Sequence, residues 1–116
     1  MPKKFIKSFK YARAGAAHTL RTQRNIWIHL TIGALVLGAG CWVRLPLAEL
    51  ALIVLTVTFV LVAEMLNTAL EETINLIKPE NHPTAALVKN VAAGAVLLAA
   101  FGAVIVGLLI FLPRLL

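Results

Sequence analysis

The sequence predicts an all-α integral membrane protein with three transmembrane helices and an N-terminal amphipathic surface helix. Of its 116 residues, 60% are hydrophobic, a larger share than in soluble globular domains. Three long apolar runs are separated by segments that contain proline, and seven of the eleven lysines and arginines fall within the first 24 residues. Because the chain is too short for a second domain, we expect residues 1–116 to form one membrane-embedded domain.

Residues 3–24 have the pattern of a helix that lies in the membrane surface. Apolar side chains recur at helical spacing on one face, and basic side chains occupy the opposite face and its flank. The apolar positions are Phe5, Phe9, Ala12, Ala16 and Leu20, and the basic ones are Lys3, Lys7, Lys10, Arg13, Arg21 and Arg24. The net charge of +6 therefore indicates anionic lipid headgroups, and we expect no nucleic-acid partner.

The first two membrane segments lie at residues 26–43 and 47–77, separated by Arg44, Leu45 and Pro46. A proline commonly marks such a break. The second segment is longer than the roughly 20 residues that cross a bilayer. Its C-terminal turns should therefore project into the interface.

The third membrane segment covers residues 91–112, after a connection with two prolines, and Thr84 is a candidate N-cap. Basic residues are concentrated near the N-terminus and in the 78–90 connection, and the positive-inside rule places both in the cytoplasm. We expect a multi-pass protein of the inner (plasma) membrane. The third segment is rich in alanine and glycine, which permit close helix contact. Three helices can hardly enclose a polar site alone, so we expect a homo-oligomer.

A stripe of polar residues follows the end of the second segment. At about 100° per residue, Glu64, Asn67, Glu71 and Asn75 share one helix face. A carboxylate at membrane depth costs roughly 2.5–3.5 kcal/mol on insertion scales, so it usually has a partner or a function. One carboxylate could bind Mg²⁺ beside substrate phosphates, and the deeper one could act as a general base toward a hydroxyl. Lys89 could neutralise a phosphoryl group, which indicates ion or phosphate handling near lipid.

The segment from Glu64 to Glu71 fits the pattern E-x-x-N-[ST]-A-x-E, and His82-Pro83 and Lys89-Asn-Val-Ala-Ala-Gly-Ala-Val follow it. With Arg24-Asn25, these motifs resemble the prokaryotic diacylglycerol kinase family, which includes the undecaprenol kinases of Gram-positive bacteria. The likeness covers nearly the whole chain. The His-Pro and Ala-Ala-Gly-Ala-Val elements are more similar to the undecaprenol branch.

The resemblance implies a homotrimer whose sites lie between subunits and transfer the γ-phosphoryl group of Mg-ATP to the hydroxyl of a lipid alcohol. Undecaprenol is favoured over diacylglycerol. By motif, Glu64 would be the general base and Asn67 would support the site. The implied metal ligands are Glu71 and Gln23. The implied ATP-binding residues are Lys4, Tyr11, Gln23, Glu71, Glu80, Asn81, His82, Lys89 and Asn90.

Three amides stand where many relatives carry acids, at Gln23, Asn75 and Asn90. These changes leave open a weakened metal site, or a catalytically degenerate, non-enzymatic membrane subunit with the same fold. Glu72 is a candidate replacement acid. An ion pathway built around the same acids is a further alternative.

Several of these residues also have purely structural interpretations. Asn67 could serve only a helix–helix hydrogen bond, and Lys89 could be an interfacial anchor. We expect His18 and His29 to be interfacial or packed residues without a chemical role.

Overall fold

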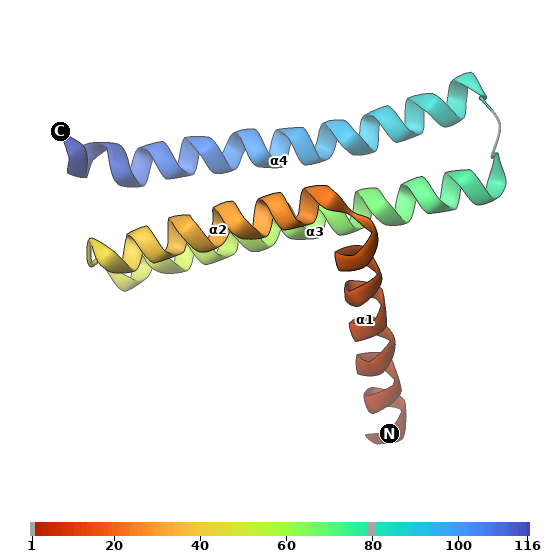
Figure 1. Cartoon of the computed structure of the whole chain (residues 1–116), viewed down its shortest axis with the longest axis horizontal. Helices are drawn as coiled ribbons and strands as arrows, with labels where there is room; N and C mark the ends of the chain where they lie inside the picture. The colour runs from red at the N-terminus through yellow and green to blue at the C-terminus, as the bar shows by residue number, and fades with distance from the viewer. Residues whose placement is uncertain (1, 79–80) are drawn as a thin grey trace.

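A computed structural model describes residues 2–78 and 81–116 of the chain, and within these residues all the regular secondary structure is helical. This described part contains four helices. Their bounds are α1 Pro2–Thr22, α2 Arg24–Trp42, α3 Leu47–Ile77 and α4 Pro83–Leu115. Figure 1 shows α2, α3 and α4 side by side, with α1 running across them.

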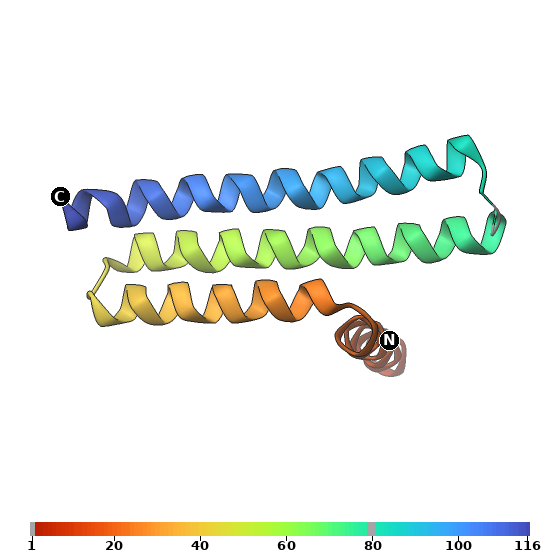
Figure 2. The same cartoon turned by 45° about the horizontal axis from the view of Figure 1, so that its top comes forward.

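Helix α3 is the centre of the bundle, because it packs against α2 on one side and α4 on the other. Figure 2 shows the three helices stacked in that order, each antiparallel to the next. In the described residues, α2, α3 and α4 are the three helices that are long and apolar enough to cross a membrane. The predicted all-α membrane fold, with three spans and an N-terminal helix, is therefore confirmed.

Buried positions on α2 and α4 recur every seven residues, and most of them are glycine or alanine. On α2 the buried positions are Ile26, Gly33 and Gly40, and on α4 they include Ala85, Ala92 and Ala99. Seven-residue spacing keeps one face of a helix against a neighbour that runs nearly parallel or antiparallel to it. Small residues on that face let the backbones approach closely, which is how helices associate in lipid.

Large apolar side chains cover the outside of the bundle. Phe59 of α3 and Phe101 of α4 are both more than half exposed, and many leucines on all three helices are exposed in the same way. In water, a surface of this kind would be unfavourable. It suits lipid or the matching surface of another subunit.

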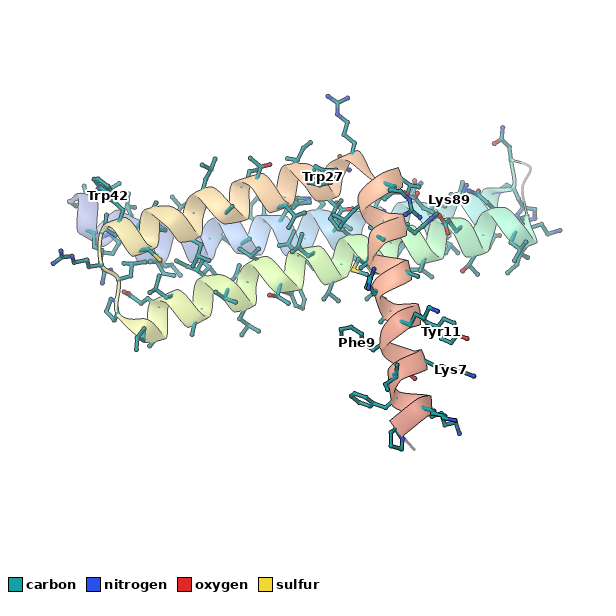
Figure 3. The ribbon with its side chains drawn as sticks, turned by 60° about the horizontal axis from the view of Figure 1, so that its bottom comes forward. Lys7, Phe9, Tyr11, Trp27, Trp42 and Lys89 are labelled. Atoms are coloured by element: carbon teal, nitrogen blue, oxygen red, sulfur yellow. The ribbon has the colours of Figure 1, made fainter. Side chains whose placement is uncertain are left out.

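Helix α1 leaves the bundle sideways, across its long axis (Figure 1). In Figure 3, Phe9 points toward the half of the bundle that carries Trp42, whereas Lys7 and Tyr11 point toward the half that carries Lys89. An interfacial helix should divide its apolar and basic side chains in this way. The C-terminal part of α3 and the start of α4 continue past the junction with α1, in agreement with the expected projection of α3 beyond the membrane.

The helix ends lie near the expected breaks, with differences at α1, at α4 and at α2, which spans Arg24–Trp42 where 26–43 was expected. The chain turns at Arg44, whose φ of 58° is left-handed, and α3 then has the expected bounds. Helix α1 stops at Thr22. Helix α4 begins well before residue 91, and its N-cap is His82, not Thr84: the imidazole Nδ1 accepts a hydrogen bond from the Thr84 backbone N–H at 3.1 Å. Proline fits the first turn of a helix because its φ is already helical.

Candidate functional site

Glu64 is the most deeply buried acid among the described residues, with 2% of its surface exposed. Its Oε1 lies 3.1 Å from Nε2 of His29 on the neighbouring helix α2. One turn further along α3, the hydroxyl of Thr68 donates to the Glu64 backbone carbonyl at 3.0 Å. A buried carboxylate is costly unless it has a hydrogen-bond partner, and His29 supplies that partner.

Asn67 and Glu71 form the next part of the stripe. The Asn67 side-chain Nδ2 donates to Oε1 of Glu71 at 3.1 Å. Within the described residues, Oδ1 of Asn67 is buried and has no hydrogen-bond partner. A free amide oxygen beside a carboxylate is a set of oxygen donors of the kind that Mg²⁺ prefers when it binds one or two protein ligands and substrate phosphates. Asn67 and Glu71 therefore fit this metal.

Asn75 closes the stripe near the end of α3 and holds Lys89 of α4. The lysine Nζ donates to Oδ1 of Asn75 at 2.5 Å, which joins the two helices near the end of the bundle at which Figure 3 shows Lys89. The four stripe residues and Lys89 thus lie along a single region of α3 and the facing part of α4. Asn90, the next residue, is exposed.

Glu72 lies beside this stripe but has a different partner. Its Oε1 is 2.6 Å from Nε2 of His18, near the end of α1. The pair ties the surface helix to α3 immediately beside Glu71. This contact occupies the acid that was a candidate replacement for the missing carboxylates.

The remaining predicted residues are spread out within one chain. Lys4 and Tyr11 are exposed on α1, and Figure 3 shows Tyr11 well away from the bundle. Gln23 is partly buried in the extended break between α1 and α2, where its backbone N–H donates to the Thr19 carbonyl at 2.9 Å. Asn81 and His82 precede α4, and Glu80 lies outside the described residues. A single chain therefore does not bring Lys4 and Tyr11 to the stripe.

One apolar hollow is lined by His29, the partner of Glu64, and another reaches the stripe at Asn67. One, of about 250 Å³, lies between α2, α3 and α4 and has His29 among its lining residues. The other, of about 660 Å³, lies between α3 and α4 and includes Asn67. Both are lined almost entirely by aliphatic side chains. The smaller hollow has His29 in its lining, and the larger one has Asn67.

The sequence patterns did not predict that His18 and His29 pair with glutamates of α3. His18 and His29 come from other helices than their acidic partners, 54 and 35 residues away in the chain, and helical periodicity relates only residues of one helix. The available signal was indirect: a glutamate inside an apolar segment needs a hydrogen-bonding partner, and His29 is a polar side chain within the facing segment.

Comparison with known proteins agrees with this architecture. Residues 10–111 match the family described as prokaryotic diacylglycerol kinase. The chain is 43% identical to the undecaprenol kinase of Bacillus subtilis over 112 residues, which cover 97% of this chain and 91% of that protein. It is 44% identical to the diacylglycerol kinase of Synechocystis sp. over 112 residues, which cover 96% of this chain and 64% of that protein. The chain therefore belongs to the prokaryotic diacylglycerol kinase family, which confirms the lipid kinase enzyme class predicted from its sequence.

Proposed function

We propose that this lipid kinase transfers the γ-phosphoryl group of ATP to the hydroxyl of a membrane alcohol, with undecaprenol favoured over diacylglycerol. The observation that carries the proposal is the buried Glu64 carboxylate, which lies 3.1 Å from His29, a residue that lines an apolar hollow. A lipid tail suits such a hollow, and the hydroxyl at its head would then meet the acid. The preference for undecaprenol rests on the near full-length match to a relative of that name.

The residues of the stripe divide the chemistry between them. Glu64 accepts the proton of the lipid hydroxyl as general base. Glu71 and Asn67 would hold Mg²⁺, with Gln23 as a further ligand, and the ion would supply charge neutralisation for the ATP phosphates. Lys89 exchanges its hydrogen bond with Asn75 for contacts with the phosphates. Phosphoryl transfer needs mainly positioning and charge stabilisation, so few side chains suffice.

The nucleotide contacts are proposed to be completed between subunits of a homotrimer. Lys4 and Tyr11 are exposed on a helix that leaves the bundle, so they can reach the stripe of a neighbouring chain more readily than their own. Gln23, Asn81, His82, Asn90 and Glu80 are assigned to the same nucleotide site. The exposed apolar surface and the exposed small residues of α4, such as Gly94, support close association of subunits.

The N-terminus and the connection between α3 and α4 are placed in the cytoplasm of the inner membrane, because ATP is there and the basic residues gather there. Cys41 is the single cysteine, so a Cys41→Ser background accepts one cysteine at a time. A membrane-impermeant maleimide should label Arg44→Cys in intact cells and Asn81→Cys after permeabilisation. The reverse pattern would contradict the orientation.

A kinase assay tests the function directly. Purified protein in mixed micelles receives Mg-ATP with either undecaprenol or diacylglycerol, and lipid phosphate is measured. We expect product from both lipids and a higher kcat/KM for undecaprenol. Glu64→Gln should lower kcat by about 10²- to 10⁴-fold while keeping its fold. Lipid phosphate at background from the unaltered protein, beside an active reference kinase, would rule out the proposal.

A further inference from the structure

His29 is the polar side chain that contacts the buried carboxylate of Glu64 within the described part of the chain. Its Nε2 lies 3.1 Å from Oε1, and its own side chain is 21% exposed, against 2% for the glutamate. The histidine is carried by α2 and the glutamate by α3, so the contact spans one of the two main helix interfaces.

Other polar groups near Glu64 are already engaged. The buried Thr68 hydroxyl donates to the backbone carbonyl of Glu64, and the Asn67 amide donates to Glu71. Neither of these hydrogen bonds orients the Glu64 carboxylate. The hydrogen bond from His29 fixes Oε1 and leaves Oε2 for a second partner.

We infer that His29 is a positioning residue for the phosphoryl transfer, an inference that rests on the proposed function. With the proton on Nε2, the imidazole donates to Oε1 and holds the carboxylate in one rotamer. Oε2 then takes the proton from the substrate hydroxyl as the hydroxyl oxygen bonds to the γ-phosphorus. The bond from that phosphorus to the bridging oxygen breaks, and ADP leaves. His29 itself does not touch the substrate in this step.

The His29 position near the apolar hollow supports this role. The side chain lines the hollow together with aliphatic residues of all three long helices, such as Ile32 and Val60. Apart from His29 and Thr56 the lining is apolar, so few other polar groups are available there to restrain the carboxylate that His29 contacts. A misplacement of a reacting group by about 1 Å can cost about 100-fold in rate, so the orienting hydrogen bond should appear in kcat.

Three variants test the inference by kinetics. His29→Leu removes the donor, His29→Gln retains an N–H donor at a similar reach, and Thr31→Leu is the matched control, an exposed α2 position whose hydroxyl bonds only to its own helix. We expect His29→Leu to lower kcat by about 10- to 100-fold with little change in the KM for ATP or lipid. His29→Gln should recover most of kcat, and Thr31→Leu should behave as the unaltered protein. Equal kcat in His29→Leu and Thr31→Leu, or a loss that appears only in KM, would overturn the positioning role.

A spectroscopic measurement makes the inference testable without turnover. In protein labelled with ¹⁵N-histidine, the three imidazoles come from His18, His29 and His82. Glu64→Gln should shift the Nε2 and proton signals of His29 and leave the other two in place. Unchanged His29 signals would overturn the inference even if His29→Leu failed to fold. A second outcome is that the unaltered protein has no kinase activity but Glu64→Gln still shifts the His29 signals. That result would refute both the proposed function and the positioning role, and it would confirm only the hydrogen bond between His29 and Glu64.

Discussion

His18 of α1 and Glu72 of α3 are hydrogen-bonded, with 2.6 Å between Nε2 and Oε1. Their side chains are 44% and 55% exposed, so the contact lies at the outer edge of the junction between the surface helix and the bundle. The backbone carbonyl of Leu20, two residues beyond His18, accepts from the indole N–H of Trp27 at 2.6 Å. Together the two bonds fix the direction in which α1 leaves the bundle.

Breaking the His18–Glu72 contact should loosen α1 without unfolding the bundle. Solvent-exposed pairs contribute about 0.2–1 kcal/mol, so His18→Ala should lower the free energy of unfolding by no more than that. The larger expected effect is faster amide hydrogen exchange in α1. Exchange in α3 and α4 serves as the internal control. Unchanged exchange along α1 would show that the contact does not hold the helix.

Gly33 of α2 packs closely against Val57 of α3. A Cβ added there would lie 2.7 Å from Cγ1 of Val57. Gly33→Ala should therefore destabilise the bundle by about 1–3 kcal/mol, the usual cost of overpacking. Gly38→Ala is the matched control on the same helix, since no atom lies within 4 Å of its added Cβ.

The compensating variant makes the Gly33 prediction specific. Val57→Ala removes the methyl groups that an alanine at position 33 would meet, so the double variant should be less destabilised than the sum of the two single ones. Unfolding of detergent-solubilised protein by SDS would measure all four variants. Additive losses would mean that the two side chains do not compete for the same space.

Arg114 and Glu49 join the far ends of α4 and α3 through two hydrogen bonds. Nη2 lies 2.7 Å from Oε2 and Nη1 lies 3.3 Å from Oε1. Arg114→Ala should lower the free energy of unfolding by about 1 kcal/mol. Arg114→Lys should recover only part of this loss, because the guanidinium, unlike an ammonium group, matches both carboxylate oxygens. Kinase activity should stay near the unaltered level, since the pair lies at the end opposite Lys89. SDS unfolding and the lipid assay measure the two effects, and a large loss of activity would contradict this separation.

The fold was predictable because membrane-spanning helices require long apolar segments, which are easily recognised in a sequence. Length and hydropathy located the three spans, and Pro46 and the proline-rich connection located the breaks. The bounds of α3 coincide with the expected ones. Hydropathy placed the start of the third segment at residue 91, but α4 begins at Pro83. The residues from Pro83 to about residue 90 are helical but too polar for hydropathy to assign them to a membrane span.

The site was predictable only within one helix. The face shared by Glu64, Asn67 and Glu71 follows from the helical period, and their hydrogen bonds fit that alignment. His29, the partner of Glu64, and Lys89, the partner of Asn75, lie on other helices. Pairing across helices depends on register, which the sequence does not reveal. The contacts proposed for Lys4 and Tyr11 would involve a second subunit, so a single chain does not place them.

Gln23 provides a test of the amide substitutions. It lies in the break between α1 and α2 and makes no side-chain hydrogen bond to the N-terminus of α2. If it faces the proposed metal site, Gln23→Glu adds a charged oxygen ligand, and charge count tunes the affinity of such sites. The Mg²⁺ concentration for half-maximal kinase activity should therefore fall several-fold. Thr22→Glu, which adds the same charge at the exposed neighbouring position, should leave that concentration nearly unchanged. Equal shifts in both variants would mean that the added charge acts through the general surface potential and that Gln23 is not a metal ligand.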